Sequence, residues 1–428
     1  MRWIFELAVL AGIIAGWTPA IANPVAGSMP ITATAQLRAP VGRDQIHIGL
    51  LTYGPAGTIM SQYGHAAIVV FDGEGRSELY ELAAESPDHR YSLPWYLTPQ
   101  KLIYRSERGP LSATLHGAFL QLRDVQLRVL NLSDEQQTKL ASRIAREMLP
   151  ERAHFEFGVY TQNCTTRIRD LLNDALGGQL RRQLGNDPAT MSYRDHSLRA
   201  FASNPLIAIG LDLSLGRLSD YTPTRWDESF YPESLALALD ELSVSASSNG
   251  TTPIVKSVST ILVGEPTLRM APMPPDFTPG LAATGAGLLL LLLLGRRLNQ
   301  PIVRAAEGTL LAFFGLVGLF LLYLWFVGGE PVASWNENVL LFNPLLLMFV
   351  TSGSDRIKKW SSMLVLASVS LAVLLKFVPH AQANIGWILF AGPSIVYLTF
   401  RWNQLSRLRG QSSGDLLQSI WLMRDSIR

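Results

Sequence analysis

The segment "YTQNCTTRIRDLL", Tyr160–Leu172, contains the only cysteine among the 428 residues of this chain. Its apolar residues recur at helical spacing from Ile168 onward, and Gly177 is a suitable stop, so the segment predicts an amphipathic helix. Asn163 is a natural N-cap, which places Cys164 in the first turn. There the positive end of the helix dipole and unpaired backbone N–H groups favour a thiolate over a thiol. Cys164 is therefore either a small buried apolar residue or a nucleophile.

A nucleophilic thiolate needs a proton acceptor, and histidine suits that role near neutral pH. The best placed is His65 in "SQYGHAAIVVF", at the start of an apolar strand and directly after a glycine that allows close approach of another backbone or a ligand. His116, His154 and His196 are competing bases. A histidine at the end of a strand is also compatible with a surface or purely structural role.

The supporting groups are less clearly marked. Glu81 on the next strand is the candidate to orient the histidine, with Glu78 and Glu85 as alternatives that equally suit solvated strand positions. Backbone N–H groups at the helix start would stabilise an oxyanion, with Tyr53 or Tyr63 as helpers. The chain has no C-x-x-C or H-x-x-x-H pair, Gly-rich phosphate loop or G-x-S-x-G elbow. We therefore predict no metal and no cofactor.

Around these residues the sequence predicts an α+β domain over residues 36–242. Apolar strands are expected at 45–53, 64–72 and 125–132, with another after the turn at 73–75. Ser133 and Gln136 form a capping box that opens a helix at Asp134–Met148. The Ser-, Thr- and Pro-rich stretch 243–279 predicts a linker that contains one strand at 254–263.

The two ends of the chain indicate export and membrane insertion. Residues 1–22 combine a basic residue, a short apolar stretch and a small-x-small site, which is typical of a secretory signal peptide; a retained anchor is the alternative. Five apolar runs, at about 281–295, 310–327, 339–350, 363–377 and 385–400, predict a bundle of about five membrane helices over 280–402, followed by a cytoplasmic tail at 403–428.

The distribution of charge supports one orientation. The short loops and ends around residues 296–304, 356–359 and 401–409 are basic, whereas the loop 328–338 carries acids and no Lys or Arg. The positive-inside rule therefore places the α+β domain outside the cytoplasm. The net charge of +2 reflects these topological residues and predicts no nucleic-acid partner.

Three stretches resemble the Lnb family of bacterial lipoprotein N-acyltransferases. They are "LLTYGPAGTIMSQYGHAAIVV" (residues 50–70), "LRVLNLSDEQQ" (residues 127–137) and the cysteine segment. A weaker similarity at "SWNENVLLFNPLLL" (residues 334–347) would carry over Asn338, Asn343 and Pro344 as candidates near the outer membrane face. The order of signal peptide, periplasmic domain and membrane helices also resembles that family.

This resemblance implies a permuted papain-like domain, related to lecithin:retinol acyltransferase and NlpC-type cell-wall peptidases, in which the histidine strand precedes the cysteine helix. It also implies an inner-membrane enzyme whose cysteine takes an acyl chain from a phospholipid and passes it to the α-amine of a lipoprotein N-terminal cysteine. The residues alone leave two alternatives: a membrane-tethered cysteine hydrolase acting on cell wall or lipid, and a noncatalytic membrane scaffold.

Overall fold

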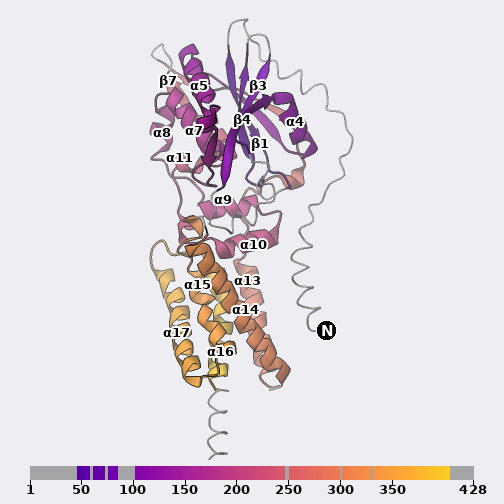
Figure 1. Ribbon diagram of the computed structural model, residues 1–428, viewed down its shortest axis with the longest axis vertical. Helices are drawn as coiled ribbons and strands as arrows, with labels where there is room; N and C mark the ends of the chain where they lie inside the picture. The colour runs from indigo at the N-terminus through magenta and orange to yellow at the C-terminus, as the bar shows by residue number, and fades with distance from the viewer. Residues whose placement is uncertain are drawn as a thin grey trace, which may run out of the picture. The chain divides into compact units, whose positions relative to one another are not determined.

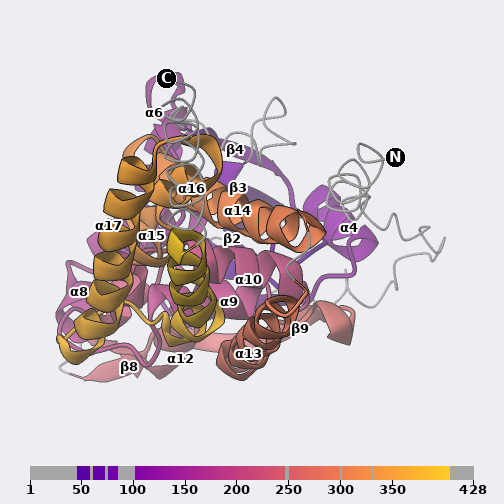
Figure 2. The ribbon, with the colours of Figure 1, turned by 90° about the horizontal axis from the view of Figure 1, so that it is seen from below.

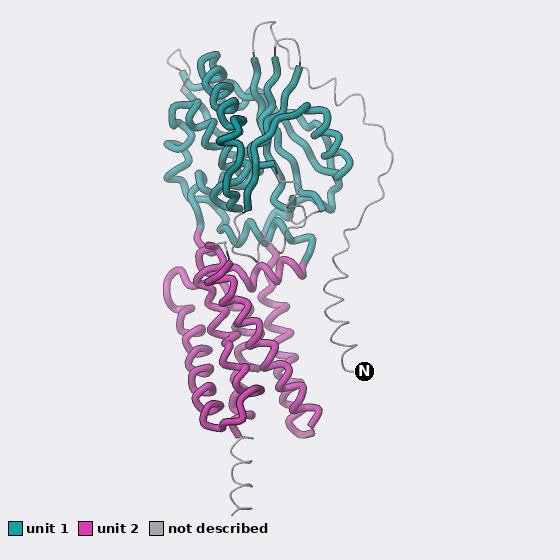
Figure 3. Tube along the Cα trace, viewed as in Figure 1, with its two compact units in different colours: residues 1–92, 101–204, 222–273 teal, residues 93–100, 205–221, 274–428 magenta. Residues whose placement is uncertain are grey.

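The structure is a computed structural model that describes residues 46–57, 61–72, 76–84, 102–245, 250–298, 301–328 and 331–404. The chain divides into two compact units (Figure 3): one comprises residues 1–92, 101–204 and 222–273, and the other comprises 93–100, 205–221 and 274–428. The expected signal peptide, Glu85 and the tail from residue 405 onward lie outside the described residues.

The first unit is built on an antiparallel seven-stranded sheet with the order β6-β4-β3-β2-β1-β5-β9. Its strands are β1 (His47–Tyr53), β2 (His65–Phe71), β3 (Ser77–Ala84), β4 (Ile103–Pro110), β5 (Val125–Leu130), β6 (His154–Glu156) and β9 (Val255–Leu262). The strands expected from the sequence at 45–53, 64–72 and 125–132 are confirmed. A separate hairpin pairs β7 (Ser243–Ser245) with β8 (Thr251–Pro253).

Helices cover both faces of this sheet (Figure 1). Alternate residues of the central strands point to opposite faces, so Leu50 and Ala66 pack with α7 (Cys164–Ala175), whereas Leu51 and Ala67 pack with α4 (Leu111–Leu120). The remaining helices of the unit are α5 (Asp134–Glu147), α6 (Pro150–Ala153), α8 (Gln179–Leu184), α9 (Tyr193–Ala200), α11 (Arg225–Glu228), α12 (Pro232–Glu241) and the 3₁₀ turn Pro266–Leu268.

Both predicted capping sites are present. Ser133 and Gln136 form a reciprocal capping box that opens α5, and Asn163 caps α7 with Cys164 as its first residue. Gly177 follows the end of α7 with a φ of +60°, a conformation in which glycine is favoured. These local signals fix where the helices begin and end.

Within the stretch 243–279, which the sequence predicts to be a linker, the strand expected at 254–263 is confirmed. Residues 255–262 form β9, which pairs antiparallel with β5 at the edge of the main sheet. Its Ser and Thr residues are mostly exposed, whereas Ile261 and Leu262 pack into the core with Val125. An edge strand with one solvated face accepts such a polar composition, which is why its sequence resembles a linker.

The second unit is helical, and three of its described helices are long and apolar enough to cross a membrane: Thr278–Gly295 (α13), Pro301–Phe326 (α14) and Asp355–Phe377. The last comprises α17 (Asp355–Leu374) and a 3₁₀ turn (Leu375–Phe377). A further helix covers 385–404 and supplies Ile395 and Leu398 to the core of the unit. The other elements are α10 (Pro205–Ser214) and the 3₁₀ turns Arg217–Asp220 and Pro331–Ala333.

The third apolar run does not form the spanning helix expected from its composition. It divides into α15 (Asn338–Leu341), a 3₁₀ turn (Pro344–Leu347) and α16 (Met348–Thr351), and α15 and α16 lie between α14 and α17 (Figure 2). Pro344 lacks a backbone N–H and disfavours helical geometry at Asn343, which is extended with ψ at 127°. The Asn-Pro pair therefore breaks the helix.

Candidate active site

Cys164 begins α7 and is 8% exposed. The side-chain oxygen of Asn163 accepts hydrogen bonds from the backbone N–H groups of Thr165 and Thr166, at 2.9 Å each. Among the described residues, the N–H of Cys164 itself has no such partner. The sequence suggested the N–H groups of the helix start as oxyanion donors; the geometry leaves Cys164 as the donor available there.

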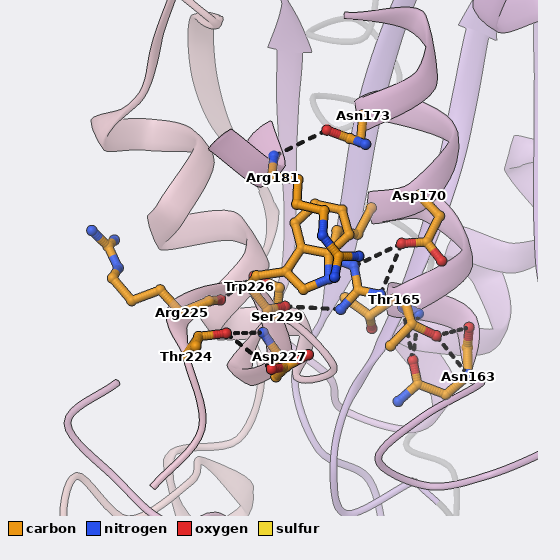
Figure 4. Close-up of polar contacts among 12 residues, drawn as sticks. Asn163, Thr165, Asp170, Asn173, Arg181, Thr224, Arg225, Trp226, Asp227 and Ser229 are labelled. Atoms are coloured by element: carbon orange, nitrogen blue, oxygen red, sulfur yellow. Dashed lines mark hydrogen bonds and ion pairs between the residues drawn. The ribbon is translucent and has the colours of Figure 1, made fainter. Parts of the chain in front are cut away.

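Asn163 also ties the start of this helix to the rest of the unit. Its side-chain nitrogen donates to the carbonyl oxygens of Val159 at 2.7 Å and Phe230 at 2.9 Å. One turn further along α7, Arg169 donates to the carbonyl oxygen of Trp226 at 2.8 Å, and Trp226 lies beside the helix (Figure 4). The contacts of Asn163 and Arg169 therefore attach the start of α7 to the segments around it, and they fix the position of Cys164.

His65 is the first residue of β2, opposite Tyr53 in the register with β1. The preceding Gly64 has a φ of +77°, and a Cβ atom on it would lie 2.6 Å from the carbonyl oxygen of Tyr53. The glycine expected to allow a close backbone approach is therefore required for that reason. It lets β1 and β2 meet tightly at the end that presents His65.

The side chains of Cys164 and His65 interact with each other, and each shifts the pKa of the other. Burial raises the pKa of Cys164, but the His65 side chain, the Thr165 hydroxyl and the backbone N–H of Ala66 lower it, and the net pKa lies below the ordinary 9.0. Burial likewise lowers the pKa of His65, whereas Cys164 and Glu81 raise it to about 10. The two shifts together favour a thiolate–imidazolium pair.

Glu81 on β3 completes this arrangement. Its Oε2 atom lies 3.3 Å from Nε2 of His65, and each side chain is about one-fifth exposed. Burial raises the pKa of Glu81, but His65 and Arg123 lower it below the ordinary 4.5, so the carboxylate is charged. Of the acidic candidates, Glu78 instead contacts the hydroxyl of Tyr80 at 2.6 Å.

The competing bases are placed differently. His116 on α4 and His154 on β6 are exposed. His196 is buried, and its Nε2 atom lies 2.9 Å from Oε1 of Glu228. Tyr63 donates to the hydroxyl of Ser197 at 3.1 Å, which gives it a packing partner at α9.

Tyr53 and Arg123 line a cavity of about 230 Å³ that His65 and Glu81 also line. Burial raises the pKa of Tyr53 well above its ordinary value, so the hydroxyl is a donor, yet this buried hydroxyl has no hydrogen-bond partner in the part of the chain that the structure describes. One terminal nitrogen of Arg123 is also buried and has no hydrogen-bond partner among the described residues. Arg123 was not among the residues expected from the sequence. No local motif marks it, because it becomes relevant only when the turn after α4 meets the end of β1.

The candidates from the weaker sequence similarity, Asn338 and Asn343, are held within the second unit. The side chain of Asn338 donates to the carbonyl oxygen of Leu213 at 3.0 Å and accepts from Asn384 at 2.8 Å. Asn343 donates to Ser368 at 3.2 Å. Both side chains therefore form hydrogen bonds with backbone or side-chain groups of their own unit.

A wider polar network surrounds Asn338. The terminal nitrogen of Lys376 lies 2.6 Å from Oε2 of Glu337 and 2.6 Å from Oδ1 of Asn384. In the same network, Asn336 donates to the last two carbonyl oxygens of α10, and Gln382 donates to the carbonyl oxygen of the residue after it. The network therefore fixes residues 205–215 to the membrane helices of the same unit.

Comparison with protein-family models gives two matches. Residues 33–197 match the Lnb N-terminal periplasmic domain, and residues 278–401 match the Lnb transmembrane domain. Together the matched residues make up more than half of the chain. The chain belongs to the Lnb family. No curated protein and no solved structure matches it.

Membership of the Lnb family agrees with the architecture described above. The α+β unit corresponds to the Lnb periplasmic domain, and the helical unit corresponds to the Lnb transmembrane domain. The Lnb protein described here is therefore a membrane protein with a periplasmic domain. That domain holds Cys164, His65 and Glu81. Among the described residues, no group of three or more His, Cys, Asp or Glu side chains is arranged to hold a metal ion.

Proposed function

We propose that this protein is an acyltransferase of the bacterial inner membrane that carries a fatty acyl chain on Cys164 as a thioester. The donor is a phospholipid, and the acceptor is the α-amine of a lipoprotein N-terminal cysteine. The observation that supports this most strongly is the contact of Cys164 with His65, and of His65 with Glu81, in a chain of the Lnb family. The proposal requires no metal or cofactor.

In the first step, the Cys164 thiolate attacks the carbonyl carbon of the phospholipid ester. The negative charge that develops on the carbonyl oxygen is stabilised by the N–H of Cys164 at the start of α7. Collapse of this intermediate breaks the bond to the glycerol oxygen, and His65 gives its proton to that oxygen. The products are a lysophospholipid, a thioester on Cys164 and a neutral His65.

In the second step, the acceptor amine attacks the thioester carbonyl carbon. His65, now neutral, accepts a proton from the attacking nitrogen, and the Cys164 thiolate leaves. The product is an amide, and the thiolate–imidazolium pair is restored. A thioester suits this sequence because it reacts with amines and persists long enough to await a second substrate.

The membrane unit supports the choice of substrates. Both substrates are lipids, and three helices within the described residues are apolar and of membrane-spanning length. Within this unit, Glu307 and Arg401 form a buried ion pair at 2.6 Å between α14 and the helix 385–404. The paired charges suit a structural platform, because each is neutralised by the other inside the bundle.

The test uses the full-length protein in nanodiscs with acyl-labelled phospholipid. We expect a hydroxylamine-sensitive label on Cys164 that a diacylated lipopeptide moves to its own amine, and no label on Cys164→Ser. Because the chain has one cysteine, a label lost on this substitution identifies the site. Cys164→Ser should melt at nearly the same temperature as the wild type, which controls for unfolding.

The two alternatives give different results. Label that is lost to water at the same rate with and without lipopeptide would indicate a membrane-tethered hydrolase. A folded protein that takes up no label would indicate a noncatalytic scaffold, and would refute the proposal.

A further inference from the structure

Among the described residues, two buried donors at the cavity beside His65 and Glu81 have no hydrogen-bond partner. These are the hydroxyl of Tyr53 and one terminal nitrogen of Arg123. Leaving a buried donor unsatisfied costs about 1–3 kcal/mol, and more for a charged group. The cavity, at about 230 Å³, has room for several water molecules. An arginine kept in this position at such a cost calls for a reason beyond packing.

The position of Arg123 is well defined. It follows Leu122, whose φ is 56°, and its own backbone N–H bonds the carbonyl oxygen of Ala118 at the end of α4. Its Nε donates to the carbonyl oxygen of Gly54 at 2.8 Å, and the guanidinium carbon lies 5.3 Å from the ring centroid of Tyr53. One edge of the guanidinium is thus held, and the rest faces the cavity.

The charges at the site explain what this guanidinium does. The thiolate of Cys164 and the carboxylate of Glu81 are two anions that share one imidazolium, His65. With these three groups alone, the buried site would carry a net negative charge, and one anion would tend to take up a proton. Arg123 is always protonated, interacts electrostatically with both anions, and brings the sum to zero.

We propose that Arg123 is a positioning residue that allows Cys164 and Glu81 to be ionised at the same time, through its charge at the cavity behind His65. The groups that face this cluster from the packed elements are Tyr53 on β1, His65 on β2, Glu81 on β3 and Cys164 on α7.

Among the described residues, the charged neighbour of Arg123 in the chain is already paired. Asp124, the next residue in the chain, lies 2.9 Å from Arg269 and also accepts from the backbone N–H of Gly264. From α4 and the residue that caps its end, the cavity is lined by the uncharged side chains of Thr114 and Gln121. Within the described part of the chain, Arg123 is therefore the cation that acts on the cluster from this side.

The experiment measures the rate at which iodoacetamide alkylates Cys164 in the full-length protein, as a function of pH, by intact mass. Because the chain has a single cysteine, the added mass reports alkylation of Cys164. Two substitutions separate charge from geometry: Arg123→Gln keeps a donor for the carbonyl oxygen of Gly54 but removes the charge, and Arg123→Lys keeps the charge. Gln121→Ala, which alters the cavity wall without a change in charge, is the matched control.

We expect Arg123→Gln to raise the half-maximal pH of alkylation by about one unit, which slows alkylation about tenfold at pH values below it. Arg123→Lys should stay within about threefold of the wild type, because the charge acts over distance. Gln121→Ala should match the wild type.

Two results would overturn the inference: a wild-type profile for Arg123→Gln, or an Arg123→Lys profile as shifted as that of Arg123→Gln. If Arg123→Gln does not fold, Arg123→Lys still tests the inference. A shift of a full unit in the half-maximal pH of alkylation in Arg123→Lys would contradict a role for charge.

This inference rests on the proposed function, in which Cys164 is the nucleophile. Its test needs no lipid, so the two can fail separately. A normal alkylation profile in a protein that transfers no acyl group would count against the function. Acyl transfer with an unshifted Arg123→Gln profile would count against the role of Arg123.

Discussion

Asn163 offers the sharpest test of how the structure holds its cysteine. Replacement by alanine removes four hydrogen bonds of one buried side chain: two accepted from the N–H groups of Thr165 and Thr166, and two donated to the carbonyl oxygens of Val159 and Phe230. Each bond contributes about 1 kcal/mol. Because the four share one side chain they are not independent. We expect a total loss of about 3 kcal/mol, compared with about 1 kcal/mol for an ordinary N-cap.

Hydrogen exchange of the full-length protein, read on the peptide that begins α7, measures this loss locally. A loss of about 3 kcal/mol corresponds to exchange more than one hundredfold faster for the amides that lose their cap. Asn173→Ala is the matched control on the same helix (Figure 4). Its side-chain oxygen accepts one exposed hydrogen bond, from the N–H of Arg181 at 3.0 Å. We expect it to cost about 1 kcal/mol or less.

The exchange rates of Asn163→Ala and Asn173→Ala, compared with each other, test whether the buried hydrogen bonds of Asn163 hold the start of α7. Equal acceleration in both variants would mean that the buried position of Asn163 adds nothing. Unchanged exchange at the start of α7 in Asn163→Ala would mean that the helix start is held by other contacts. In either case the account of how the thiolate is positioned would be wrong.

Two further predictions concern charge. In Glu81→Gln the pKa of His65 should fall from about 10, so the imidazolium should lose its proton at lower pH in an NMR titration of the His65 ring. Since the raised pKa stabilises the fold fully below the ordinary 6.5 and loses this effect as pH rises through about 10, the variant's deficit in melting temperature should be largest at low pH and vanish above 10. An equal deficit at every pH would contradict this. Lys376→Met leaves the buried carboxylate of Glu337 unpaired, which should cost about 3–5 kcal/mol and lower the melting temperature in detergent by several degrees. The exposed Lys256→Met should change it little, and equal effects would refute the role of the pair.

The features that the sequence predicts well are local. The cap at Asn163 and the capping box at Ser133 each depend on a few consecutive residues, and the structure has both. The alternating apolar pattern likewise gives the central strands. Such signals are readable because the interactions they describe are formed within one turn or one strand.

The features that the sequence misses depend on contacts between distant segments. Tyr63 meets Ser197 on α9, more than a hundred residues further along the chain. The sequence predicts a strand at 254–263, but it does not predict the pairing of β9 with β5 at the edge of the main sheet, because β5 lies far earlier in the chain. Asn338 satisfies a carbonyl group of α10, which belongs to a segment that the sequence places in the soluble domain. A buried polar residue reveals its role only when its partner is known.

The balance of charge at the site also bears on why a thioester could persist there. In the free protein, the anions Cys164 and Glu81 face the cations His65 and Arg123, and the sum is zero. In the proposed acylated state the sulfur is neutral, and His65 has given up its proton to the leaving group. Glu81 and Arg123 then remain as one opposite pair, and the sum is again zero. Neither state leaves an unpaired charge in a buried site, which would be costly. Without Arg123, both states would carry a net negative charge beside the sulfur, where it opposes ionisation of the thiol and departure of the thiolate.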